Sequence, residues 1–215
     1  MFKIKNYDNR LIEDMYNKAM NELGEFFGVN WTRNQPRIYI VKDRGAASKW
    51  WGRESTSSGW INGSDIYILD RSTLNKYRLQ KYPNSKKYSN REYFMLIKHE
   101  LAHVFTRLSI NFFNGQQLSP DWLWEGIAEY LSGINIYKKK PEKFKKFLKY
   151  EDKNIGDLGV YEESGYAVEF LVEKYGKEKL LELIKYFREP YSRVTFEKRF
   201  KKVYGFELNY KNFNK

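Results

Sequence analysis

The histidines constrain the fold of this chain more than any other residue type. Its 215 residues contain only two, and both lie in the pentapeptide His99-Glu100-Leu101-Ala102-His103. Residues four positions apart share one face of an α-helix, so a helix here would bring the two imidazoles together. Two histidines scattered at random would show this H-E-x-x-H pattern in only about one chain in a thousand. The alternative is an ordinary pair of core or surface histidines.

The local sequence independently predicts a helix around this pentapeptide. Ser89 and Glu92 have the S-x-x-E spacing of a capping box, which places the start of a helix at about Asn90. The apolar pattern that follows carries this helix to about Ser109. Both histidines then lie well inside the helix.

The composition limits what could bind a metal ion. The chain has no cysteine, which excludes disulfides, thiolate ligands and a thiol nucleophile. Two imidazoles can bind one zinc ion, and Glu100 would lie close enough to act as a general base toward a water on it. A catalytic zinc ion normally has three protein ligands, so the third must be a carboxylate.

Candidates for the third ligand lie in a second predicted helix, from Pro120 or Asp121 through Leu131 and ending at Gly133. This segment contains Glu125 and Glu129, four positions apart on a mostly apolar helix. Acidic groups on an apolar face are costly unless they are paired or bind a metal. The alternative is that both carboxylates are exposed on a surface helix.

H-E-L-A-H followed by W-x-x-E-G-x-A-E-Y resembles the gluzincin metallopeptidases. The resemblance implies a zinc-dependent hydrolase that acts on a peptide or protein substrate. It implies that Glu125 is the third zinc ligand and that Glu129 supports a zinc-bound histidine from outside. It covers about residues 36–204 and is specific at the two metal motifs.

A segment further along, Tyr161-Glu162-Glu163-Ser164-Gly165-Tyr166, resembles the Y-E-x-G segment of gluzincin aminopeptidases. The resemblance implies that Tyr161 stabilises the oxyanion of the reaction. The glycine stands one position later than in the family, which leaves Tyr166 as a rival, and both tyrosines could be simple core or helix-start residues. No counterpart of the family's G-x-M-E-N motif is present, which favours an endopeptidase over an aminopeptidase.

Upstream of the histidines, the pattern predicts a strand over 37–41, a glycine- and tryptophan-containing loop, and a second strand over 66–69. In the gluzincins the second strand is an exposed edge that pairs with the substrate backbone. The resemblance therefore assigns substrate binding to Ile66, Tyr67, Ile68 and Leu69. The loop contains Trp50, Trp51 and Trp60, which either line the substrate cleft or pin the loop to the core.

The elements together predict an α+β fold, in which a small mixed sheet packs on the zinc-binding helix and a mostly helical half follows. We expect one metallopeptidase domain over 1–215, divided into an N-terminal helix (1–35), the sheet with the H-E-x-x-H helix (36–110) and a helical part with the third ligand (111–215). Further predictions are helices over 8–27, 162–175, 177–188 and 194–204, a solvated basic helix over 138–150 and a polar connection over 76–90.

Other functions receive less support from the sequence. The net charge of +12 favours anionic partners, but no nucleic-acid-binding motif is present and the basic residues are spread along the chain, so nucleic acid is an unlikely partner. No signal peptide or membrane span is visible, which predicts a soluble chain, cytoplasmic by default. Two alternatives remain: an inactive metal-binding relative with a regulatory role, and a latent enzyme whose first 30 or so residues occupy the cleft.

Overall fold

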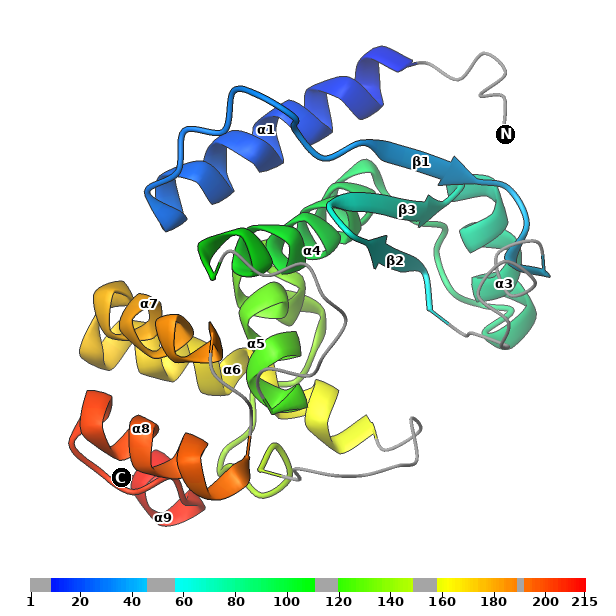
Figure 1. The fold of residues 1–215 in the computed structure, drawn as a ribbon. Coiled ribbons are helices and arrows are strands. Elements are labelled where there is room, and N and C mark those ends of the chain that lie inside the picture. Colours follow the sequence, from blue (N-terminus) through cyan, green and yellow to red (C-terminus); the bar gives the residue numbers. More distant parts are fainter. Residues whose placement is uncertain (1–8, 46–56, 111–119, 149–157, 189–191) are drawn as a thin grey trace.

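The computed structural model describes residues 9–45, 57–110, 120–148, 158–188 and 192–215. It confirms the α+β class: a small mixed sheet is followed by a mostly helical half (Figure 1). The elements in chain order are α1 (Asn9–Phe27), β1 (Ile38–Val41), β2 (Gly59–Asn62), β3 (Asp65–Leu69), α3 (Arg71–Lys81), α4 (Asn90–Ser109), α5 (Asp121–Ser132), η1 (Ile134–Tyr137), α6 (Leu158–Tyr175), α7 (Lys177–Lys185), η2 (Tyr186–Arg188), α8 (Arg193–Tyr204) and α9 (Tyr210–Phe213).

The strand order of the sheet is β1-β3-β2. β1 runs parallel to β3, and β2 runs antiparallel to it through a turn at Gly63, whose φ of 60° suits glycine. The prediction that residues 66–69 form an exposed edge is therefore wrong, because both edges of β3 are hydrogen-bonded within the sheet. Within the described part of the chain, the free edge next to α4 belongs to β2.

The sheet packs on α4 through the alternation of its central strand. Ile66 and Ile68 of β3 are fully buried, whereas Tyr67 between them is only half-buried. α4 begins and ends as predicted, and both hydrogen bonds of its capping box between Ser89 and Glu92 are present. This cap fixes the start of the helix that carries both histidines.

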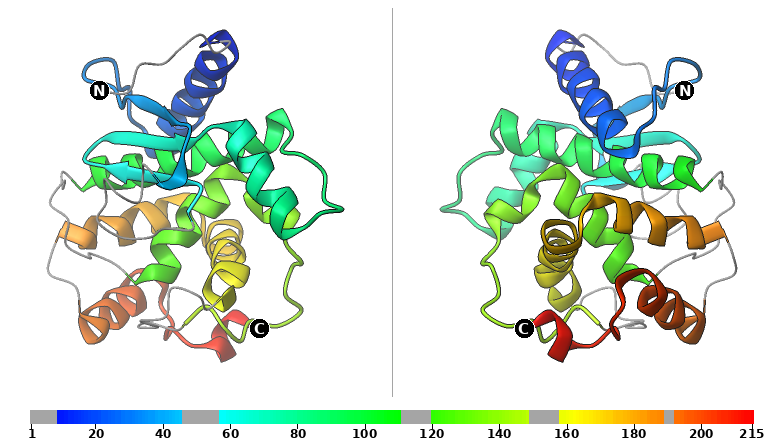
Figure 2. Two further views of the ribbon diagram at one scale, coloured as in Figure 1. Left: turned by 90° about the vertical axis from the view of Figure 1, so that its right-hand side faces the viewer. Right: turned by 90° about the vertical axis from the view of Figure 1, so that its left-hand side faces the viewer.

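The N-terminal helix packs on the core. Met15, Ala19 and Leu23 are buried on one face of α1, which lies against α4. Figure 2 places α1 on the opposite side of α4 from α8 and α9. The described part of the N-terminal segment therefore favours core packing over occupation of a cleft.

The helical half is built around a close contact between α5 and α6. A Cβ atom at Gly126 would lie 2.6 Å from the carbonyl oxygen of Ser164, so only glycine allows this approach. Beneath the contact, the fully buried ring of Trp122 meets Phe147, Phe196 and Phe213 edge-to-face. α5 is thus anchored at its first turn, immediately before Glu125.

Two further sequence-based assignments are wrong. Residues 76–81 belong to helix α3 rather than to a connection, because Asp70 caps the helix by accepting a hydrogen bond from the Ser72 amide and Leu74 is buried. The described part of the basic segment, 138–148, contains no α-helix. There the amides of residues 145, 146 and 147 donate to the buried Glu163 carboxylate. None of the helices that the structure describes is both long and apolar enough to cross a membrane.

Candidate metal centre

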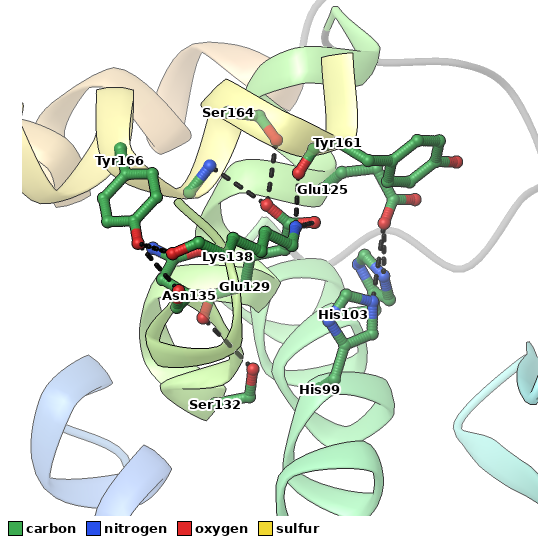
Figure 3. A network of polar contacts seen from close by, with 11 residues as sticks. His99, His103, Glu125, Glu129, Ser132, Asn135, Lys138, Tyr161, Ser164 and Tyr166 are labelled. Carbon is green, nitrogen blue, oxygen red and sulfur yellow. Dashed lines mark hydrogen bonds and ion pairs between the residues drawn. The ribbon is translucent and has the colours of Figure 1, made fainter. Parts of the chain in front are cut away.

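The three predicted metal ligands meet between α4 and α5 (Figure 3). The Nε2 atoms of His99 and His103 lie 3.4 and 3.7 Å from the same carboxylate oxygen of Glu125. Two donors on one tetrahedral zinc ion with bonds of about 2.05 Å would be about 3.4 Å apart. The three side chains could therefore hold a metal ion with little movement.

The donor set also fits zinc chemically. Two imidazole nitrogens and one carboxylate oxygen are a ligand set found in catalytic zinc sites, which keep a further position open. The side chain of His103 is only 6% exposed, whereas those of His99 and Glu125 are 16% and 19% exposed. The cluster thus reaches the surface on one side, where a water or substrate atom could approach.

The charges of the cluster hold Glu125 as an anion. Burial alone would raise the pKa of Glu125, but the two adjacent imidazoles outweigh it and hold this pKa well below its usual range. Burial works to lower the pKa of His99, but its hydrogen bond to Glu125 and the nearby carboxylates raise it overall. Burial lowers the pKa of His103. Glu125 is therefore deprotonated, as a metal ligand must be.

Glu100 lies beside the ligands, and strand β2 covers it. The residue is 7% exposed, and burial raises its pKa to about 7 against the opposing effect of His99. A Cβ atom at Gly59 would lie only 2.6 Å from Oε1 of Glu100, so glycine is what lets the strand approach this carboxylate. Gly59 cannot be recognised from the sequence, because the close contact depends on how the sheet packs on α4.

Trp124 orients His103. Their rings are stacked, with centroids 4.7 Å apart and planes 12° apart. Neither Nδ1 atom of the two histidines has a hydrogen-bond partner among the described residues. Ring stacking therefore replaces the hydrogen bond that commonly fixes a metal-binding imidazole. Trp124 was not among the predicted site residues, although its position immediately before Glu125 in the sequence could have indicated it.

Glu129 does not make the contact that was expected of it. Its buried carboxylate accepts hydrogen bonds from Lys138 Nζ, Ser164 Oγ (3.0 Å) and the Gly165 amide (3.1 Å), rather than from either histidine. No hydrogen bond among the described residues joins this carboxylate to a histidine ring, because the start of α6 and Lys138 occupy its oxygens, although its charge helps to raise the pKa of His99. Glu129 instead joins α5 to the helix that carries Tyr161.

The two rival tyrosines lie in different surroundings. The Tyr166 hydroxyl lies 2.7 Å from the backbone carbonyl oxygen of Asn135 and 2.8 Å from that of Lys138, so these two acceptors share its one proton, on the far side of Glu129 from the histidines (Figure 3). Tyr161 lies beside Glu125 and is 42% exposed. Partial burial and the neighbouring carboxylates, with Glu125 the strongest, raise its pKa, so its phenol keeps its proton. Tyr161 is the better placed of the two for contact with a substrate.

The predicted site residues are thus only partly brought together. His99, His103 and Glu125 form one cluster, with Tyr161 at its edge and Glu100 near enough for its charge to interact with His99 and Glu125, whereas residues 66–69 lie in the middle of the sheet. Trp60 lies in β2, and Trp50 and Trp51 fall outside the described residues. No model of a protein family, no curated protein and no solved structure was found to match the chain.

Proposed function

We propose that this chain is a zinc-dependent peptidase of the gluzincin type, acting on internal peptide bonds more readily than on N-terminal residues. One observation carries the proposal: two imidazole nitrogens and a Glu125 oxygen converge on one point, with the buried Glu100 beside them. A zinc ion bound there would acidify a water and polarise a substrate carbonyl.

Each residue of the cluster has a separate task in this proposal. His99, His103 and Glu125 hold the ion, and Glu100 takes a proton from the water and returns it to the leaving amine. The protonated phenol of Tyr161 donates a hydrogen bond to the developing oxyanion. The edge of β2 with which no described strand pairs takes the place of residues 66–69 as the strand that pairs with an extended peptide, and Gly59 at the start of β2 lies against Glu100.

The first test is the zinc content of the purified chain and of Glu125→Ala. We expect about one zinc ion per wild-type chain, and an affinity at least about a hundredfold lower in the variant, since loss of an outer-shell partner alone costs up to that much. Glu178→Ala, which removes an exposed carboxylate on α7, should bind zinc like the wild type. Elemental analysis after dialysis against a competing chelator provides the measurement.

The outcomes separate the proposal from its alternative. Zinc binding together with cleavage of unstructured protein substrates supports a peptidase. Zinc binding without any cleavage would instead indicate an inactive metal-binding module. A wild-type chain that takes up no zinc would contradict both functions.

Gly59→Ala is expected to reduce kcat while zinc remains bound. The new methyl group would meet Oε1, Cγ and Cδ of Glu100 at 2.6–2.8 Å, so the carboxylate has to move. A displacement of about 1 Å at a catalytic group can lower the reaction rate about a hundredfold. Gly63→Ala strains the half-buried turn of the same hairpin, where φ is 60°, but its methyl group would meet nothing within 4 Å, so this variant should keep more of the activity. Equal losses in the two variants would mean that the contact with Glu100 is unimportant.

A further inference from the structure

Arg107 continues the line of the two histidines along α4. His99, His103 and Arg107 follow one another at steps of four residues, so they lie on one face of the helix. The guanidinium carbon of Arg107 lies 5.6 Å from the centroid of the Trp124 ring, which itself stacks on His103. A charge on Arg107 also acts to lower the pKa of His103. Arg107 is therefore part of the surroundings of the candidate metal centre.

The guanidinium of Arg107 has no anionic partner among the described residues. It donates one long hydrogen bond of 3.5 Å to the Gly63 carbonyl, and burial lowers its pKa without any carboxylate to oppose the effect. Arg78, which is also half-buried, pairs with Glu92 at 2.7 Å, and this partner raises its pKa. A guanidinium remains charged even so, and a half-buried charge without a counter-ion is costly to maintain.

Strand β2 connects Arg107 with the proposed catalytic base. Gly59, at the start of the strand, touches Glu100, and the Gly63 carbonyl just after its end meets Arg107. β2 therefore runs along α4 in the same direction as the helix (Figure 1). A peptide paired with the free edge of β2 would pass from Glu100 toward Arg107. One helical turn separates His103 from Arg107, about 6 Å, or about two residues of extended peptide.

We infer that Arg107 is a carboxylate-binding subsite that selects substrates with a negative charge within about three residues of the scissile bond. The inference rests on the proposed peptidase function. The carboxylate belongs either to an acidic side chain or to the free C-terminus of a short peptide. The planar guanidinium fork suits a carboxylate, and Trp124 holds the fork in place from one side.

The test compares pairs of peptides that differ only in charge. One series, blocked at both ends, carries glutamate or glutamine at each of the three positions on either side of the cleaved bond. A second series carries a free or an amidated C-terminus. We expect the wild type to prefer one charged member by at least about tenfold in kcat/KM, since a hydrogen bond to a charged group contributes that much. The series that shows the preference identifies the source of the carboxylate.

Arg107→Gln should remove this preference by lowering kcat/KM much more for the charged peptide than for its neutral twin. Arg107→Lys, which keeps the positive charge but lacks the planar guanidinium fork, should retain part of the preference for the charged peptide. Arg91→Gln removes the same charge from the exposed start of α4 and should leave the preference intact. The ratio between twin peptides is insensitive to a general loss of folding or of zinc. A wild type without any preference, or an undiminished preference in Arg107→Gln, would overturn the inference.

Failure of the proposed function can be recognised separately. If the wild type cleaves nothing, the subsite can still be tested by peptide binding. Calorimetry would measure the affinity for a blocked alanine peptide that carries two central glutamates and for its glutamine twin. Tighter binding of the glutamate peptide to the wild type than to Arg107→Gln, again by at least about tenfold, supports the subsite without any catalysis. Equal affinity of the glutamate peptide for the wild type and for Arg107→Gln would exclude the subsite.

Discussion

Glu100→Gln is expected to lower kcat by about 10²–10⁴-fold while zinc binding stays at the wild-type level. Glutamine has nearly the shape of glutamate, so the close contact with Gly59 is retained. Its amide cannot accept the proton that the proposed mechanism assigns to residue 100. Glu100 is not one of the three ligands, so the ion should remain bound. Hydrolysis rates and zinc content measured on the same preparations give both quantities.

A matched control and one rival residue sharpen this experiment. Glu178→Gln makes the same chemical change at an exposed position of α7 and should leave kcat unchanged. Asp121 lies one turn before Glu125 on α5, and burial raises its pKa, as does the nearby Glu125. Wild-type kcat in Glu100→Gln would show that another group, with Asp121 the first to examine, accepts the proton.

The features that the sequence predicted well depend on local geometry. A spacing of four residues fixes which helix face His99 and His103 share, wherever that helix lies in the fold. The capping box at Ser89 and the stop at Gly133 act within one or two helical turns, and the structure confirms both. Local geometry alone does not predict that Glu125 lies beside the histidines, because that contact depends on how α5 packs on α4.

The features that the sequence missed depend on contacts between distant segments. A short run of apolar residues identifies β3 as a strand, but such a run does not tell a central strand from an edge. That difference arises because residues 59–62 fold back on it through the turn at Gly63. The contacts of Gly59 with Glu100 and of Arg107 with the Gly63 carbonyl follow from the same pairing. No local pattern around these residues encodes them.

Glu129 is a single residue whose contacts with distant segments could not be predicted from the local sequence. Its place one turn after Glu125 suggested a partner among the histidines. Its actual partners lie 9, 35 and 36 residues away, at Lys138, Ser164 and Gly165. Lys138 Nζ also donates to the carbonyl of Tyr161, so one buried carboxylate fixes both the lysine and the start of α6. Glu129 should therefore matter first for stability and only indirectly for catalysis.

Glu129→Ala is accordingly expected to lower the free energy of unfolding by about 3 kcal/mol. Lys138 is 23% exposed and can turn toward water, but Ser164 is fully buried and loses the acceptor of its hydroxyl. Glu129→Gln keeps an acceptor oxygen and should cost less, about 1–2 kcal/mol. Glu162→Ala, at the exposed start of α6, breaks an ion pair with Lys146 and should cost below about 1 kcal/mol.

Urea titrations of the wild type and the three variants, all with zinc removed, measure these differences in the free energy of unfolding without contributions from metal binding. Equal costs for Glu129→Ala and Glu162→Ala would mean that the buried network adds nothing beyond a surface ion pair. The expected order, with Glu129→Ala the most destabilised, leads to a further consequence. Under conditions where this variant is still folded, the start of α6 loses the contact that positions Tyr161. The kcat of Glu129→Ala should then fall while its zinc affinity changes little, because no hydrogen bond among the described residues joins Glu129 to a histidine.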